Sequence, residues 1–113
     1  MAGQTTGWPI TQGGQTAFVQ MIEFSTTRAD EIRALVDEYR DTTEGVRTSG
    51  TGMVCADRDQ PNRYVTIVQF DSYEDAMKNS ELPETSAMAA KMMELCDGPP
   101  TFRNLDVVET IEP

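Results

Sequence analysis

The stretch Arg63-Tyr-Val-Thr-Ile-Val-Gln-Phe-Asp-Ser72 predicts a β-strand that is largely apolar on both faces. Successive side chains of a strand point in opposite directions, so one face would hold Tyr64, Thr66, Val68 and Phe70, and the other Val65, Ile67 and Gln69. A small sheet usually has helices on one face and water on the other. An apolar second face therefore predicts that something else covers this sheet.

The segments around this strand predict the element order β-α-β-β-α-β. Alternating apolar residues, a helical stripe at Ile32, Leu35, Val36 and Tyr39, and a hairpin-like turn at 57–63 support that order. Pro83 interrupts the second helical region, so we expect a short helix followed by a new one. The predicted strands are 17–24, 48–57, 63–70 and 101–111; the first predicted helix follows an N-cap at Thr27, and the other two start at Tyr73 and about Pro83.

This order predicts an α+β domain of the ferredoxin-like type. Right-handed crossovers turn it into a four-stranded antiparallel sheet with the helices on one face and the first and third strands at the centre. We expect the domain to span residues 17–111. Residues 1–16, rich in Gly, Thr and Gln, are expected to form a flexible N-terminal tail.

Alternation sorts the strand residues into two sets, of which one is uniformly apolar in its middle and the other mixes apolar and aromatic residues with polar ones. We expect the more uniformly apolar set to lie under the helices, and the set with polar groups among aromatic side chains to form the open face. A second copy packed on that open face would give a homodimer with a shared barrel. The expected helix-covered set is Val19, Met21, Val65, Ile67, Leu105 and Val107, with Glu23 and Gln69 at strand ends; the expected open set is Phe18, Gln20, Ile22, Phe24, Tyr64, Thr66, Val68, Phe70, Phe102, Asn104, Asp106 and Val108.

Composition excludes several function classes. The formal net charge of −10 disfavours nucleic acid and anionic membrane surfaces as partners. No apolar run approaches the roughly 20 residues that span a bilayer, and the first residues lack a signal-peptide pattern, so a cytoplasmic protein is expected. The chain has no histidine, which removes Ser-His-Asp and Cys-His mechanisms. Cys55 and Cys96 are expected to be buried free thiols, without a metal site.

The run from Arg63 to Ala76, together with 17–24 and the helix broken at Pro83, resembles the dimeric α+β barrel superfamily, and within it the antibiotic biosynthesis monooxygenase-like proteins. A strand that ends in an aromatic residue, then an acid, Ser and a helix with an early Ala is recurrent in that family. The resemblance implies the fold, a homodimer, and a function among cofactor-free monooxygenases, haem-degrading enzymes, cyclases, isomerases and dehydratases. Haem-degrading and quinone-forming members carry an Asn on the first strand and a Trp at the end of the third, and the haem enzymes also carry a His on the second helical region. This chain has Gln20, Phe70 and no histidine at those places, so no haem or other cofactor is expected.

The sequence and the resemblance together predict a mostly apolar pocket between the expected open face of the sheet and the second helical region. The expected ligand is a small aromatic or polyketide-like molecule, and a catalytic protein would be a cofactor-independent monooxygenase. The alternatives are a non-catalytic ligand-binding or assembly protein, and a cyclase or isomerase of the same fold. In this pocket Gln20 and Asn104 would orient the ligand, and Tyr64 and Phe70 would stack on it. Asp106 would act as the base if it is enclosed. The rest of the pocket would be formed by Ile22, Thr66, Met77 and Met88.

Overall fold

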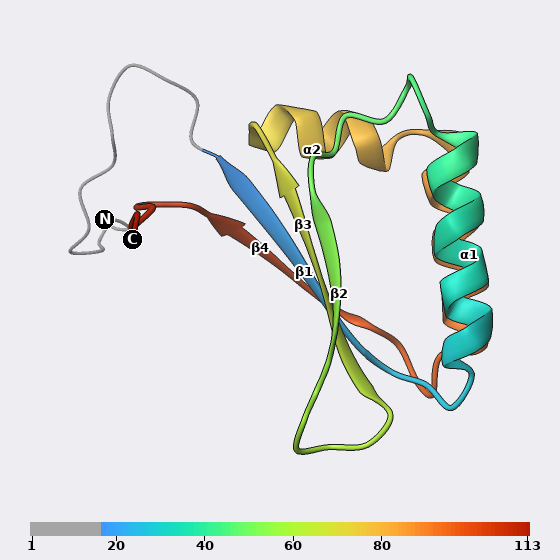
Figure 1. Cartoon of the computed structure of the whole chain (residues 1–113). Helices are drawn as coiled ribbons and strands as arrows, with labels where there is room; N and C mark the ends of the chain where they lie inside the picture. The colour runs from blue at the N-terminus through green and yellow to red at the C-terminus, as the bar shows by residue number, and fades with distance from the viewer. Residues whose placement is uncertain (1–16) are drawn as a thin grey trace.

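The computed structural model describes residues 17–113; the predicted N-terminal tail at 1–16 lies outside the described residues (Figure 1). The predicted element order is confirmed, with the second helical region divided in two at Pro83. The elements are β1 (Phe18–Ser25), α1 (Ala29–Thr42), β2 (Gly52–Ala56), β3 (Arg63–Phe70), α2 (Tyr73–Ser80), α3 (Pro83–Leu95) and β4 (Thr101–Asp106).

The four strands form one antiparallel sheet in the order β2-β3-β1-β4. The first and third strands occupy its centre, as predicted. β1 pairs along its whole length with β3, and its first six residues pair with β4, so Phe18 lies opposite Phe70 on one side and Asp106 on the other. The α+β plait expected from the sequence is therefore confirmed.

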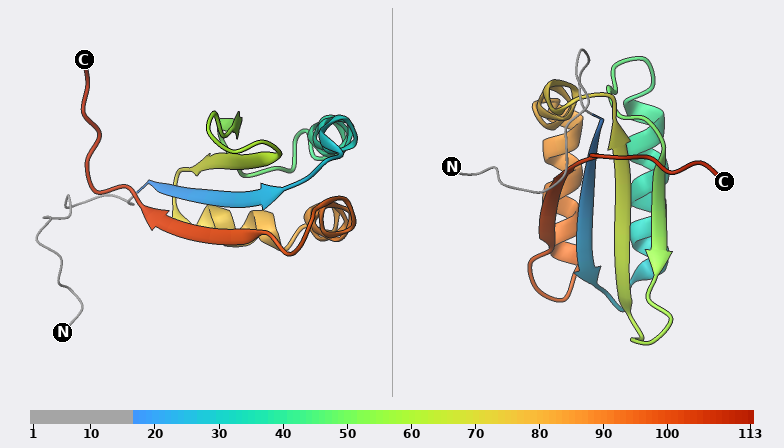
Figure 2. Two further views of the ribbon diagram at one scale, coloured as in Figure 1. Left: turned by 90° about the horizontal axis from the view of Figure 1, so that it is seen from below. Right: turned by 90° about the vertical axis from the view of Figure 1, so that its left-hand side faces the viewer.

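All three helices lie on one side of the sheet. Figure 2, right panel, shows α1 behind β2 and β3, and α3 behind β1 and β4, with α2 across one end. α1 and α3 run side by side and are joined by a hydrogen bond of 2.9 Å between the hydroxyls of Tyr39 and Thr85. No helix within residues 17–113 is long and apolar enough to cross a bilayer.

Three element ends differ from the predictions. β2 begins at Gly52 rather than at 48, because Thr48 is bonded to α2: its hydroxyl donates to the Asp75 carbonyl at 2.6 Å. β4 ends at Asp106, which is paired with Phe18, rather than at 111; within residues 17–113 only the Val107 N–H, which donates to the Ala17 carbonyl at 2.8 Å, continues this pairing. α1 begins at Ala29 without a side-chain cap, where a cap at Thr27 was expected.

A cluster of aromatic side chains forms the core at the α2 end of the sheet. Phe18, Phe70 and Ala76 are buried together, and Met77 packs against them. The ring of Tyr73 meets Phe18 edge-on, with centroids 5.5 Å apart. Phe18 and Phe70 lie on neighbouring strands and Ala76 lies on α2, so this cluster fixes α2 to the end of the sheet.

The assignment of the two sheet faces made from the sequence is wrong. Phe18 and Phe70 contact Ala76 of α2, and Phe24 and Tyr64 lie with residues of α1, so the set expected to be open faces the helices. The set expected under the helices, with Val19, Met21, Val65, Ile67 and Leu105, is therefore on the face without helices (Figure 2). Aromatic rings are large enough to fill the space between a sheet and its helices, which favours them on the covered face.

A second, polar network joins the three helices where the apolar core ends. The Asn79 amide donates to the Tyr39 hydroxyl at 3.0 Å, and the same hydroxyl is bonded to Thr85. The amide oxygen of Asn79 accepts from the Thr48 N–H at 3.2 Å. Asn79 is buried, and buried polar groups need partners, so this network stabilises one arrangement of α1, α2 and α3.

The core position of Phe70 can be tested by truncation. Phe70 is 5% exposed, so Phe70→Ala should reduce the free energy of unfolding by about 3–5 kcal/mol, because it removes a buried ring and leaves a cavity. Phe102, which is 53% exposed on the same face, provides the control, and Phe102→Ala should cost less than about 1 kcal/mol. Urea denaturation at equal protein concentrations gives both values. Equal losses would contradict the assigned core.

Candidate functional site

A pocket of about 320 Å³ lies between α1 and the sheet, at the end of the sheet opposite α2. Its wall is formed by one side of α1 and by the ends of the three strands β1, β2 and β3. The lining residues are Phe24, Thr26, Ala29, Ile32, Arg33, Val36, Asp37, Val54 and Tyr64.

The helical wall follows from the spacing of residues in α1. Its five lining positions recur at intervals of three and four residues, which places them along one side of a helix. Ile32 and Val36 are apolar and lie in the middle of this stripe. Arg33 and Asp37 are exposed and lie at its solvent side. The helix therefore gives the pocket an apolar interior and a charged margin.

Aromatic rings form the sheet wall of the pocket. Phe24 of β1 and Tyr64 of β3 are register partners, and their rings are stacked with centroids 5.6 Å apart and planes 20° apart. Val54 continues this wall on β2 and is 53% exposed, so the pocket opens to solvent beside the edge strand. Flat aromatic surfaces of this kind favour planar ligands.

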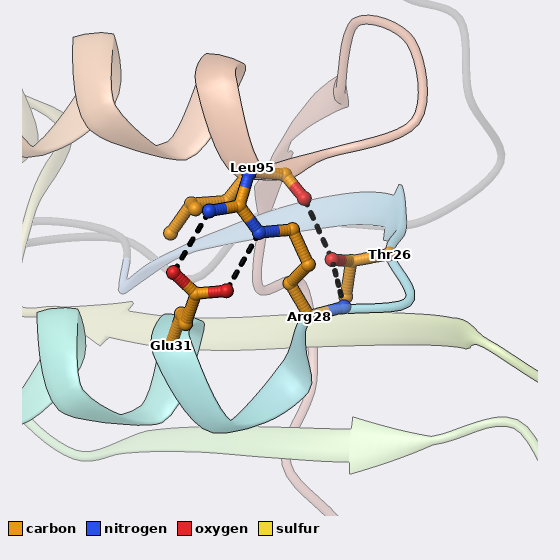
Figure 3. A network of polar contacts seen from close by, with 4 residues as sticks. All are labelled: Thr26, Arg28, Glu31 and Leu95. Carbon is orange, nitrogen blue, oxygen red and sulfur yellow. Dashed lines mark hydrogen bonds and ion pairs between the residues drawn. The ribbon is translucent and has the colours of Figure 1, made fainter.

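The side chain of Thr26 is buried and lines one end of the pocket. Figure 3 shows its two hydrogen bonds. Its hydroxyl donates to the Leu95 carbonyl at 2.7 Å and accepts from the Arg28 N–H at 2.9 Å. One contact lies at the end of α3 and the other at the start of α1. Thr26 therefore links both long helices to β1, beside the pocket.

The charges around this end are mostly paired. Arg28 donates two hydrogen bonds to Glu31, at 2.6 and 2.8 Å, and this holds the pKa of Glu31 below its ordinary value. Asp37, on the pocket wall, accepts from Arg40 at 3.1 Å. Arg33 differs: it forms no ion pair or side-chain hydrogen bond with any residue of 17–113 at these distances.

The polar residues expected to orient a ligand lie at the centre of the helix-covered face. The Gln20 amide donates to the Asn104 side-chain oxygen at 3.1 Å, across the β1–β4 pair. Gln20 is half-buried and Asn104 is exposed, while α3 contains no fully buried residue. Water therefore reaches the space between β4 and α3, and the Gln20–Asn104 pair lies in a wet layer.

The predicted site residues share a face but do not form one pocket. The strand residues among them all lie on the helix-covered face, yet only Tyr64 lines the pocket described here. Phe70 and Met77 belong to the apolar cluster at the opposite end. Asp106 is exposed, so the enclosure that its role as a base requires is absent in the single chain. Ile22, Thr66 and Met88 are half-buried.

Most of the pocket lining was not predicted from the sequence. The α1 stripe with Ile32 and Val36 was identified only as helix core, and Phe24 only as a residue of the sheet face. Arg33 and Asp37 were not singled out as site residues. The sequence held no signal for them, because charged residues flank the apolar stripe of any amphipathic helix.

The cysteines and acids do not add a further reactive centre to the described chain. Cys55 is exposed, so the prediction of a buried thiol is wrong there, whereas Cys96 is half-buried. Burial, and secondarily the neighbouring charge of Asp97, raises the pKa of the Cys96 thiol. Among residues 17–113, no group of three or more His, Cys, Asp or Glu side chains is arranged to hold a metal ion.

Comparison with known proteins identifies the fold. No protein-family model matches the sequence, and no curated protein sequence matches it either. Solved structures do match. SnoaB, a cofactor-independent oxygenase from Streptomyces nogalater, is similar over 87% of this chain and 99% of its own, with 12% identity and a TM-score of 0.73.

Two further structures give the same result. A candidate antibiotic biosynthesis monooxygenase from Caulobacter crescentus covers 84% of this chain and 92% of its own, at 14% identity and a TM-score of 0.73. Rv0793 from Mycobacterium tuberculosis covers 86% of this chain and 100% of its own, at 15% identity and a TM-score of 0.71. The chain thus has the fold of the antibiotic biosynthesis monooxygenase-like proteins, as the resemblance in its sequence implied.

The link made by Thr26 can be tested with two substitutions. Thr26 is 1% exposed, so Thr26→Val should reduce the free energy of unfolding by about 1–3 kcal/mol, because the Leu95 carbonyl and the Arg28 N–H lose their partner. Thr26→Ser keeps the hydroxyl and should retain most of that stability. Thermal and urea denaturation compare the two variants. If Thr26→Val proves as stable as Thr26→Ser, the hydroxyl does not hold the helices.

Proposed function

We propose that the protein is a homodimer that binds a small, flat aromatic or polyketide-like molecule between its sheet and its helices. The observation that carries this proposal is the pocket of about 320 Å³ with the stacked Phe24 and Tyr64 rings in its wall. Ligand sites in proteins commonly measure about 300–1,000 Å³ and combine apolar walls with a few polar groups. This pocket is at the lower end of that range, which suits a molecule of two or three fused rings.

The proposed dimer explains the face of the sheet that has no helices. Val19, Met21, Val65 and Ile67 lie at its centre and are only half-buried, while Met53 and Leu105 are exposed. A contiguous apolar patch of this kind is uncommon on a monomer surface. A second copy placed on the same face would cover both patches, since a twofold axis pairs a patch with itself.

The charges on this face support the same arrangement. Its acidic residue on β1, Glu23, is flanked by Arg103 at 3.2 Å and Arg63 at 3.5 Å. The carboxylate is therefore neutralised before any partner approaches, and the face does not share the strong negative charge of the whole chain. Burying this cluster against a second copy costs less than burying an unpaired carboxylate.

A cofactor-independent monooxygenase is the second candidate function. It is favoured by the fold shared with SnoaB, whereas the Gln20 and Asn104 amides lie outside the pocket and can contact only a substrate that extends from it toward β4. In this mechanism the pocket desolvates an electron-rich substrate anion, which reduces O₂ directly. Simple ligand binding is better supported, because Asp106 is exposed and does not line the pocket. Oxygen uptake in the presence of a bound ligand separates the two candidates.

Ligand binding can be tested with a neutral bicyclic probe, 2-naphthalenemethanol. Isothermal titration should give a dissociation constant on the order of 100 µM, as expected for so few non-hydrogen atoms. Val54→Trp should weaken binding at least tenfold, because Val54 is an exposed wall residue whose replacement by an indole would fill the pocket. Val46→Trp, at an exposed position away from the pocket, is the matched control. If the probe does not bind, or if Val54→Trp leaves its dissociation constant unchanged, the proposal that this pocket binds the ligand is wrong.

The dimer can be tested on the face without helices. Sedimentation should show a species of twice the 12.5 kDa chain mass, and Ile67→Asp should raise the dimer dissociation constant at least 100-fold, because a charge would be buried without a partner. Met93→Asp, at an exposed position on α3, should leave the dimer intact. A wild-type monomer at micromolar concentration, or an unaffected Ile67→Asp dimer, would refute the proposed interface. The sequence led us to expect Tyr64 and Phe70 in the dimer interface, but both lie on the helix-covered face of the sheet.

A further inference from the structure

Arg33 is the unpaired cation at the margin of the pocket. It lies one helical turn before Asp37 on the same stripe of α1, and both residues belong to the lining. Asp37 is bonded to Arg40 at 3.1 Å rather than to Arg33, so the negative charge at the margin is already compensated. Within residues 17–113, Arg33 has no carboxylate within ion-pair distance. Its guanidinium is thus available to a ligand.

This arrangement contrasts with the rest of the surface. The chain carries nineteen acidic and nine basic side chains, and its net charge of −10 repels a small anion at long range. At physiological salt that repulsion is screened over about 8 Å, so an adjacent cation dominates once the ligand has reached the pocket. A guanidinium also offers paired N–H donors that match a carboxylate or a similar planar oxyanion.

We propose that Arg33 makes the pocket selective for planar aromatic anions, such as aromatic carboxylates and ionised phenols. The rings of the ligand lie against the Phe24–Tyr64 wall, with Ile32 and Val36 opposite, and the anionic group lies at the solvent side against Arg33. This inference rests on the proposed function, because it assigns a ligand class to the same pocket.

The test compares two probes of the same shape, 2-naphthoate and neutral 2-naphthalenemethanol, by isothermal titration to the full-length protein. Wild type should bind the carboxylate about fivefold more tightly than the alcohol, the amount that one partly screened ion pair supplies. Arg33→Gln should bring the ratio of the two affinities close to one, mainly through weaker binding of the carboxylate, while Arg33→Lys should keep part of the preference. Raising the salt concentration should weaken binding of the carboxylate only.

Lys78→Gln is the matched control. Lys78 lies on α2 at the other end of the sheet, so this variant changes the net charge by the same amount away from the pocket and should keep the wild-type preference. If both probes bind, the proposed selectivity is wrong when Arg33→Gln leaves the ratio of their dissociation constants unchanged, or when wild type binds the alcohol as tightly as the carboxylate. In either case the proposed ligand binding in the pocket still stands. If neither probe binds to wild type, the proposed function itself fails.

Discussion

Two phenylalanines at opposite ends of β1 determine how the helices lie on the sheet. Phe18 packs with Phe70 and Ala76 and fixes α2, whereas Phe24 stacks on Tyr64 beside α1. Both rings are buried, so each end of the sheet is held by a large apolar contact. Between them the same face carries Gln20 and other half-buried residues. The helices are thus supported at both ends of the sheet, and the space between the layers stays accessible at the α1 pocket and beside β4.

The sequence predicted the order of the elements and the antiparallel sheet, because these depend on local signals such as the alternation around Val65 and the break at Pro83. It did not predict which face the helices cover. Alternation divides a strand into two sets without saying which is inside, and here both sets are apolar. Glu23 was the informative residue, because it belongs to the set that was expected under the helices. A carboxylate beside Arg63 and Arg103 is more compatible with the face that has no helices.

The candidate site was less predictable than the fold for a related reason. A pocket forms where two layers fail to meet, and that depends on how far α1 stands from the strands rather than on any short motif. Tyr64 was identified because aromatic residues on a strand are conspicuous in a sequence. Ile32 and Arg33 were not, because a helix stripe that lines a pocket has the same spacing as one that packs in a core. Structures at 9–15% identity share this fold, so the fold alone does not specify a ligand, and the proposed ligand class rests on the residues of the pocket.

The distribution of charge connects the proposed ligand class with the proposed chemistry. The chain has no histidine, Asp106 is exposed, and the carboxylate on the pocket wall, Asp37, is paired with Arg40. The described pocket therefore offers no enclosed base to remove a proton from a bound molecule. A substrate that is already an anion in water needs no such base, and Arg33 is placed to hold that anion at the margin. Under the proposed oxygenase function, the electron for O₂ would come from a phenolate that is already ionised when it binds, and the anion preference proposed for Arg33 is compatible with that chemistry.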